Sequence, residues 1–151
     1  MKKLILSAML FIAMYASAQV NSNAIGIRLS AGTEMGGEIS YQKGLTDKNR
    51  VEFNLGAASN RDYNLFNVSG TYQWVWNINN GLNWYLGPGA SFGMYNNSIG
   101  ILVGGQVGLE YDFKEFDIPF LVSIDSRPMW NFLGNYRGIG FGTALSVRYV
   151  W

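Results

Sequence analysis

The chain has 151 residues, no cysteine and no histidine, and 11 Lys and Arg residues against 10 Asp and Glu residues. These counts exclude a disulfide framework, a thiol nucleophile and a cysteine-type zinc site, and they remove the commonest general base. The near-neutral charge without a basic cluster argues against a nucleic-acid partner, and the length predicts one domain.

The first eighteen residues have the three parts of a secretory signal peptide. Met1, Lys2 and Lys3 form a short basic start, residues 4–15 are apolar apart from one serine, and residues 16–18 have the small-x-small pattern that signal peptidase accepts. The apolar run is shorter than the ~20 residues of a membrane-spanning helix, which disfavours the alternative of an uncleaved anchor. We predict a signal peptide over residues 1–18 and one mature β-barrel domain over residues 19–151.

The mature chain alternates apolar with small or polar residues, as half-buried β-strands do. We predict eight strands, over residues 23–31, 36–44, 50–59, 65–76, 82–94, 98–113, 118–128 and 139–151. Turn-forming residues separate them. The longest predicted loop, residues 129–138, holds Trp130 and Tyr136 as lipid-headgroup anchors or partner contacts. Because proline interrupts a strand ladder, we expect Pro119 at a strand start and Pro88 at a β-bulge.

Two classes of eight-stranded barrel fit this alternation, and they differ in which face meets water. A soluble barrel has its apolar face inside, whereas a membrane barrel has an apolar outer band, aromatic girdles and a polar interior. The polar face here is rich in Gly, Ser, Asn and Gln and poor in charge, which favours a crowded interior. If the strands run alternately up and down, aromatic residues of the apolar face gather near one level, among them Trp74, Trp76, Trp84, Tyr111, Tyr149 and Trp151.

We therefore predict an all-β fold, a closed eight-stranded antiparallel up-and-down transmembrane β-barrel with a polar, filled lumen. The soluble barrel is the alternative. Even strand number would put both ends of the mature domain on the periplasmic side, and closure would leave no unpaired backbone edge in lipid.

The charged residues of the polar face are predicted to form a network in two layers of the lumen. The outer layer would hold Arg28, Glu38, Asp125 and Arg127, and the periplasmic layer Glu52, Glu110, Asp112 and Arg148. Buried charges must be paired, so a salt-bridged plug is the favoured interpretation. The periplasmic layer has three acids and one base, so a cation-attracting vestibule is the alternative. A catalytic carboxylate pair is disfavoured because no substrate cleft is evident.

The last predicted strand resembles the closing strand of bacterial outer-membrane barrels. Such strands alternate apolar residues and end in an aromatic residue, and Val147, Tyr149 and Trp151 match that pattern. Residues 122–129 also resemble the penultimate strand of small OmpX/OmpA-like outer-membrane proteins. The resemblance implies an outer-membrane barrel of a Gram-negative bacterium, surrounded by outer-membrane lipid and assembled by the barrel-assembly machinery, which reads the terminal aromatic signal.

The leading functional hypothesis is a non-enzymatic integral outer-membrane protein with a structural or envelope-interaction role, whose envelope or extracellular partner is unknown. One alternative is a narrow small-solute conduit or lumen-binding sensor. Another is a lipid-modifying barrel enzyme, which the absence of histidine disfavours. We expect no catalytic residue, no cofactor and no metal site.

Overall fold

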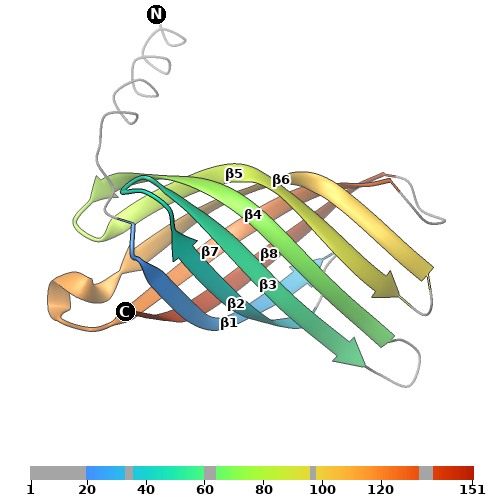
Figure 1. Cartoon of the computed structure of the whole chain (residues 1–151), viewed down its shortest axis with the longest axis horizontal. Coiled ribbons are helices and arrows are strands. Elements are labelled where there is room, and N and C mark those ends of the chain that lie inside the picture. The colour runs from blue at the N-terminus through green and yellow to red at the C-terminus, as the bar shows by residue number, and fades with distance from the viewer. Residues whose placement is uncertain (1–19, 33–35, 60–63, 96–97, 133–137) are drawn as a thin grey trace, which may run out of the picture.

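A computed structural model of the chain, shown in Figure 1, describes residues 20–32, 36–59, 64–95, 98–132 and 138–151. These residues form eight strands and one short 3-10 helix. The elements are β1 (Asn23–Gly32), β2 (Gly36–Gly44), β3 (Asn49–Ser59), β4 (Asn64–Asn79), β5 (Leu82–Tyr95), β6 (Ser98–Asp112), η1 (Phe113–Phe116), β7 (Phe120–Asn131) and β8 (Gly138–Val150).

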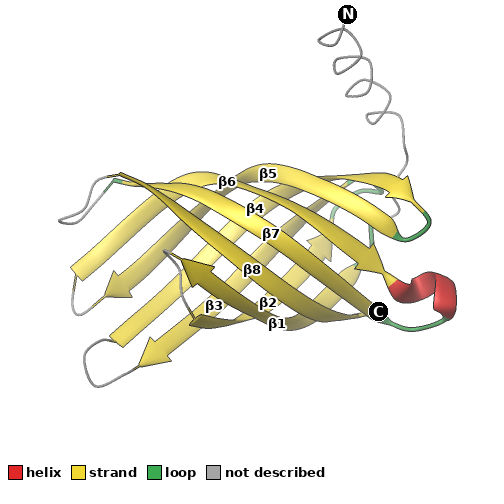
Figure 2. Cartoon of the chain, turned by 180° about the vertical axis from the view of Figure 1, so that it is seen from behind, coloured by secondary structure: helices red, strands yellow, loops and turns green. Residues whose placement is uncertain are grey.

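Each strand pairs antiparallel with its neighbours in the sequence, and β8 pairs with β1 to close the barrel. The closing register aligns Ile27 with Val147 and Leu29 with Leu145. Figure 2 shows the tilted strands from the opposite side, with η1 at one end of the barrel. The predicted fold class is confirmed. In the described part of the chain, no helix is long and apolar enough to cross a membrane.

The two ends of the barrel differ in which segments lie there. Residues 20–22, Trp151, η1 and the β2–β3 and β4–β5 turns lie at one end, here called the terminal end. At this end Trp151 N donates to the carbonyl of Asn23 at 3.1 Å. The other end, called the hairpin end, carries the connections β1–β2, β3–β4, β5–β6 and β7–β8.

Exposure alternates along every strand, and the apolar side chains are the exposed ones. Phe141 is 64% and Leu29 63% exposed, whereas Arg148 and Glu52 are 0% exposed. Among the described residues the buried apolar side chains are few: one cluster of Val75 with Tyr85, a second of Ala24 with Leu121 and Val150, and the separate Met129 and Ala144. The soluble-barrel alternative is wrong, because it requires the apolar face inside.

The aromatic side chains of the outer face form contacts near the terminal end. Trp76 stacks on Trp84 across β4 and β5 with ring centroids 4.4 Å apart, and Tyr149 stacks on Trp151 at 6.1 Å. Trp74 lies opposite Asn49, the first residue of β3, and Tyr111 lies opposite Leu82, the first residue of β5. Aromatic rings at one level are typical of a membrane–water interface.

The predicted β-bulge at Pro88 is wrong. The β4–β5 register is the same on both sides of the proline, with Thr71 opposite Gly89 and Trp74 opposite Leu86. The strand instead keeps its register and loses pairing locally, because proline has no N–H. The register shift of this pair lies between Asn77 and Asn79. Pro119 immediately precedes β7, close to its expected place at a strand start.

Several predicted element boundaries also differ from the structure, among them the end of β4, which lies at Asn79 and not at residue 76. β7 continues through Pro128 to Asn131, so Trp130 lies in a strand opposite Ile139 and not in a loop. Tyr136 lies outside the described residues. Phe113 begins η1 and does not extend β6, because Asp112 caps the helix and accepts a hydrogen bond from Lys114 N. β7 begins at Phe120, two residues later than expected.

Candidate functional site: the polar interior

The interior of the barrel holds an unusually dense set of buried charges. Inward positions alternate with the apolar outer ones on every strand, so each inward charge leaves water when the barrel closes. In the described part of the chain, the charged side chains no more than 9% exposed are Arg28, Glu38, Arg50, Glu52, Glu110, Asp112, Asp125, Arg127 and Arg148. All eight residues that the sequence placed in the lumen are among them.

Arg28 connects two carboxylates near the middle of the barrel. It lies directly opposite Glu38 in the β1–β2 register, and its Nη1 donates to Glu38 Oε2 at 2.5 Å. Its Nη2 donates to Asp125 Oδ1 at 2.6 Å, across the interior from β7. Glu38 also accepts from Asn67 Nδ2 at 2.8 Å. The side chains of the predicted outer layer therefore contact one another. The guanidinium of arginine donates from several nitrogens, which suits the paired oxygens of carboxylates.

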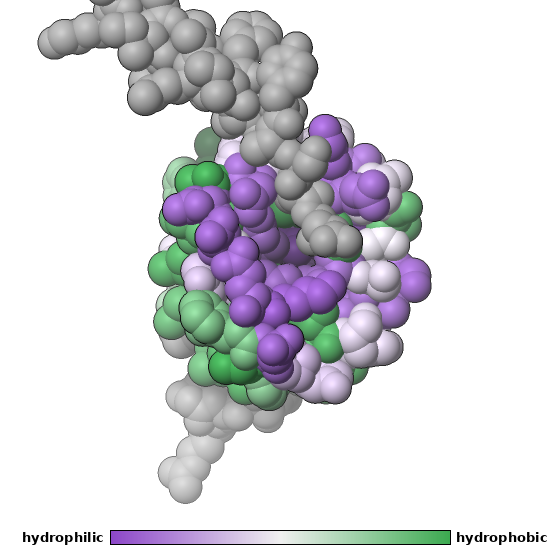
Figure 3. All heavy atoms as spheres, turned by 90° about the vertical axis from the view of Figure 1, so that its left-hand side faces the viewer, coloured by the Kyte–Doolittle hydropathy of each residue, from purple (hydrophilic) through white to green (hydrophobic). Residues whose placement is uncertain are grey.

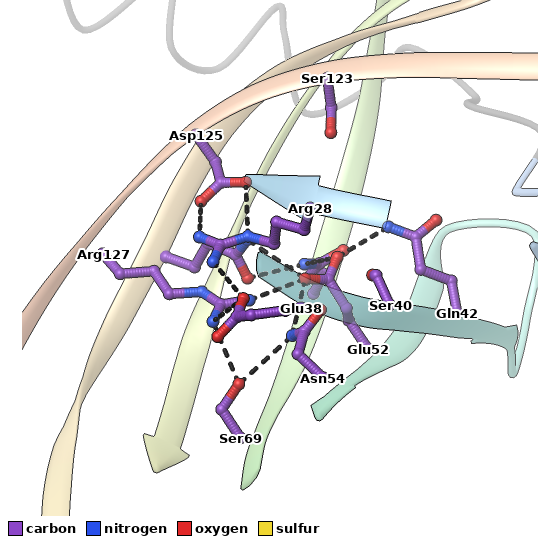
Figure 4. A network of polar contacts seen from close by, with 12 residues as sticks. Arg28, Glu38, Ser40, Gln42, Glu52, Asn54, Ser69, Ser123, Asp125 and Arg127 are labelled. Carbon is purple, nitrogen blue, oxygen red and sulfur yellow. Dashed lines mark hydrogen bonds and ion pairs between the residues drawn. The ribbon is translucent and has the colours of Figure 1, made fainter. Parts of the chain in front are cut away.

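Glu52 is the central acceptor of the interior (Figure 4). Its Oε1 accepts from Arg127 Nη2 at 2.8 Å, and its Oε2 accepts from Arg148 Nη2 at 3.1 Å. Side-chain amides supply further donors, from Gln42 at 2.8 Å, Gln73 at 3.1 Å and Asn54 at 3.1 Å. The sequence predicts Arg127 in the outer layer and Glu52 in the periplasmic one. Apart from Asp112, the two predicted layers are therefore one continuous network, because strand tilt brings these side chains to the same level.

Arg50 is a member of the network that sequence reasoning missed. Its Nη2 and Nη1 donate to the two oxygens of Glu110 at 2.6 and 3.0 Å, and its Nε donates to Gln73 at 2.6 Å. Its guanidinium lies 4.9 Å from the ring centroid of Tyr85, within cation–π range. With Arg50 the predicted periplasmic layer holds three acids and two bases, so the predicted count of one base is wrong and the acidic excess is smaller than expected. Two-residue spacing from Glu52 was the signal that could have identified Arg50.

Asp112 stands apart from the arginine network, at the mouth of the terminal end. Its carboxylate accepts from Asn21 Nδ2 at 2.6 Å and from the backbone N of Lys114 at 2.9 Å. Two cavities, of about 220 and 340 Å³, both have Asp112 and Lys114 in their walls. Figure 3, which faces this end, shows hydrophilic residues around a hollow and apolar residues on the flanks. Among the described residues no cluster of three or more carboxylate side chains could hold a metal ion.

Glycine makes room for the network at inward positions. A Cβ on Gly108 would lie 2.4 Å from the Tyr85 ring and 2.8 Å from Asp125 Cβ. The phenol of Tyr85 therefore lies over Gly108 and donates to Asp125 Oδ2 at 3.3 Å. A Cβ on Gly56 would lie 2.0 Å from Oδ1 of Asn67. The nitrogen of the same side-chain amide donates to Glu38. The small residues of the polar face are thus set by the volume of its large side chains.

Replacing Gly108 by alanine is expected to lower the free energy of unfolding by about 1–3 kcal/mol, the usual cost of overpacking. The added methyl group must displace the Tyr85 ring, which is held between Arg50 and Asp125. Urea titration of the barrel folded in vesicles measures the change. Gly138→Ala is the matched control, because its Cβ would meet nothing within 4 Å. Equal losses in both variants would contradict this account.

Comparison with solved structures places the barrel among known ones. The N-terminal β-barrel domain of Pseudomonas aeruginosa OprF aligns with a TM-score of 0.65 and 15% identity, covering 87% of this chain and 98% of that domain. P. aeruginosa outer membrane protein H (OprH) aligns with a TM-score of 0.65 and 12% identity, covering 86% and 99%. The fold is that of the small outer-membrane barrels.

A third likeness extends this group beyond one organism. Neisserial surface protein A (NspA) aligns with a TM-score of 0.54 and 16% identity, covering 85% of this chain and 94% of that one. No protein-family model and no curated protein sequence matches the chain. At these identities the likeness concerns the fold, and it agrees with the resemblance of the last strand, on which Val147 and Tyr149 face outward.

Proposed function

We propose that this protein is a non-enzymatic integral outer-membrane protein whose barrel is closed to solutes and has a structural or envelope-interaction role. One observation carries the proposal: the outer face of a closed barrel is apolar and exposed, while the buried face is charged and polar. Contact of the apolar band with water has a large free-energy cost, and contact with the hydrocarbon of a bilayer removes that cost. Closure also satisfies the backbone groups that lipid cannot.

The height of the barrel supports this placement. The strands have 9 to 16 residues, and about ten residues rising ~3.3 Å each at a tilt of ~40° span roughly 25 Å, the thickness of an outer-membrane apolar band. Trp130 and Phe141 lie toward the hairpin end of the outer face, and the stacked Trp76 and Trp84 lie toward the terminal end. The outer face thus carries aromatic rings on both sides of an aliphatic band.

The route to that membrane follows from the same proposal. Residues 1–18 serve as a cleaved export signal in a Gram-negative bacterium, and the terminal end faces the periplasm. The outward alternation of Val147, Tyr149 and Trp151 on the closing strand is the feature that the barrel-assembly machinery would read. Outer-membrane lipid is then the permanent partner of the outer face.

A closed lumen is favoured over the small-solute conduit by the interior contacts. Arg127 of β7 and Arg148 of β8 both reach Glu52 of β3 across the interior, and Arg28 of β1 reaches Asp125 of β7. Each of the three arginines is no more than 1% exposed. Their charges are held by ion pairs within the lumen and are not available to line a water-filled path. The lipid-modifying enzyme remains the disfavoured alternative, because the chain has no histidine to serve as a general base.

The proposal predicts insertion without conductance. Residues 19–151, refolded into phospholipid vesicles, are expected to migrate differently on a gel before and after boiling, because a closed barrel resists detergent at room temperature. The same protein in a planar bilayer is expected to give no conductance steps. A chain that stays folded and monomeric in buffer without lipid or detergent would contradict membrane residence, and discrete steps from verified folded protein would favour the conduit.

A further inference from the structure

Pro88 interrupts the pairing of β5 with β4. The pairs of this ladder run from Leu65–Tyr95 to Thr71–Gly89 and resume at Trp74–Leu86, so two positions at the level of Pro88 are not paired. Pairing of the same proline with β6 is intact, with Pro88 opposite Gly105. An N–H at position 88 would point toward β4, so its absence leaves a carbonyl of β4 without a backbone donor.

Pro128 interrupts the pairing of β7 with β6 in the same way. This ladder ends at Gly104–Met129 and resumes at Val107–Ser126, and its register places Gly105 opposite Pro128. Pairing of Pro128 with β8 is intact. Pro88, Gly105 and Pro128 thus form one row across three strands. The β5–β6 hairpin loses a rung to each neighbour at one level, and the part beyond that level is here called the flap (residues 88–95 and 98–105).

The flap is attached more weakly on one side than on the other. On the β4 side, paired positions continue without a gap from Thr71–Gly89 to Leu65–Tyr95. On the β7 side, the described pairs beyond the gap are Gly104–Met129, Val103–Trp130 and Leu102–Asn131, followed by one bond from Phe132 N to Ile101 O at 3.0 Å. As far as the described residues extend, the β6–β7 seam is therefore shorter than the β4–β5 seam.

The interior does not compensate for this short seam. The positions of the flap with inward parity and described side chains are Gly89, Ser91, Gly93, Ser98, Gly100, Leu102 and Gly104. They offer two serine hydroxyls, of which that of Ser98 is exposed at the hairpin end. Closer to the terminal end the same hairpin is anchored through Tyr85 to Asp125, and through Glu110 to Arg50. Low anchoring and few side-chain contacts define segments that open below the global unfolding free energy.

We propose that the flap is a hinged unit, which separates from β7 along the β6–β7 seam down to the Pro128 level while the rest of the barrel stays closed. β4 is the hinge side, and Gly105 and the two prolines set the depth of the opening. Between this row and the terminal end, the polar network of the interior holds β5 and β6 in place. The opening is lateral, toward the surroundings of the outer face, and it adds a moving element to the otherwise rigid barrel of the proposed function without depending on that function.

Hydrogen exchange of the folded barrel in detergent micelles tests the hinge. The bond from Phe132 N to Ile101 O shows that odd-numbered residues of this part of β6 turn their backbone groups to β7, whereas the even-numbered ones bond to β5 within the flap. Amides of residues 99, 101 and 103 are therefore expected to exchange at least about tenfold faster than those of residues 145–149, with a step at Gly105, since each lost rung is worth about 1 kcal/mol. The double variant Pro88→Ala/Pro128→Ala restores both N–H groups and is expected to slow that exchange. Pro119→Ala, which changes the proline before β7, is the matched control and is expected to leave it unchanged.

A disulfide across the seam provides a second, independent arm that does not rely on the proline variants folding. The chain has no native cysteine, so Val103→Cys/Trp130→Cys, a registered pair, gives a single possible bond. The oxidised form is expected to lose the fast phase, and the staple Val122→Cys/Val147→Cys between β7 and β8 is expected to retain it. Uniform exchange, a gradual decay from the hairpin tip without a step, or fast exchange that survives the seam staple would each overturn the proposal.

Discussion

Replacing Glu52 by glutamine is expected to lower the free energy of unfolding of the barrel by about 3–5 kcal/mol, the range for removing one partner of a buried ion pair. Glu52 is 0% exposed and lies within 2.8 Å of Arg127 and 3.1 Å of Arg148. The variant keeps the side-chain volume and leaves two buried guanidinium groups facing a neutral amide. The loss is electrostatic and not steric.

Urea-induced unfolding in lipid vesicles, followed by tryptophan fluorescence, measures this loss. Glu115→Gln is the matched control, because Glu115 is an exposed carboxylate of η1, and its removal is expected to leave the unfolding curve nearly unchanged. A Glu52→Gln variant as stable as the parent protein would contradict this account, because it would show that Arg127 and Arg148 do not need the charge of Glu52.

Replacing Val107 by arginine is expected to destabilise the barrel in a bilayer by about 2–4 kcal/mol, the cost of a cation on the lipid face near the midplane. Val107 faces outward on β6 and is 44% exposed, opposite Leu86 and Ser126 on the neighbouring strands. A water-facing surface would accept the same substitution at almost no cost. The sign and size of the effect therefore report directly on what surrounds the outer face.

The matched control for this variant is Ile118→Arg. Ile118 has the same exposure, 44%, but it lies in the connection between η1 and β7 at the terminal end. Its replacement is expected to change the unfolding free energy in vesicles much less than Val107→Arg does. Equal effects at both positions would remove the outer face from the hydrocarbon of the bilayer.

The period-two pattern of the sequence predicts which way the charged side chains face, because strand parity needs no knowledge of the strand ends. Arg28, Glu38 and Asp125 are inward for this reason. It fails where parity does not decide. Arg50 is the first residue of the predicted strand and the second residue of β3, and it has the inward parity of Glu52, but it was not assigned to the lumen because it lies at the strand end. Pro128 made the strand seem to end early, although β7 continues for three residues beyond it.

Neighbour relations across the lumen are beyond what the pattern can show. Glu52 is 75 residues from Arg127 and 96 from Arg148 in the chain, and their common level depends on the tilt and stagger of a closed barrel. The sequence shows the inventory of charges, but the pairing follows from a geometry that all strands determine together. The same holds for Pro88, whose effect depends on the register of the neighbouring strand.

The long chain separation of the ion pairs has a consequence for how the barrel forms. Arg28 binds Asp125, 97 residues away, and Arg148 binds Ser40 at a separation of 108, so neither arginine meets these partners until β1 and β8 have joined. Folds dominated by such distant contacts form slowly. In an incompletely joined sheet, guanidinium and carboxylate groups would lack partners. A shift of the pairing register by one residue would turn these groups to the outer face. Sheets with misaligned strands are therefore expected to be less stable than the native one, because their arginines lack carboxylate partners.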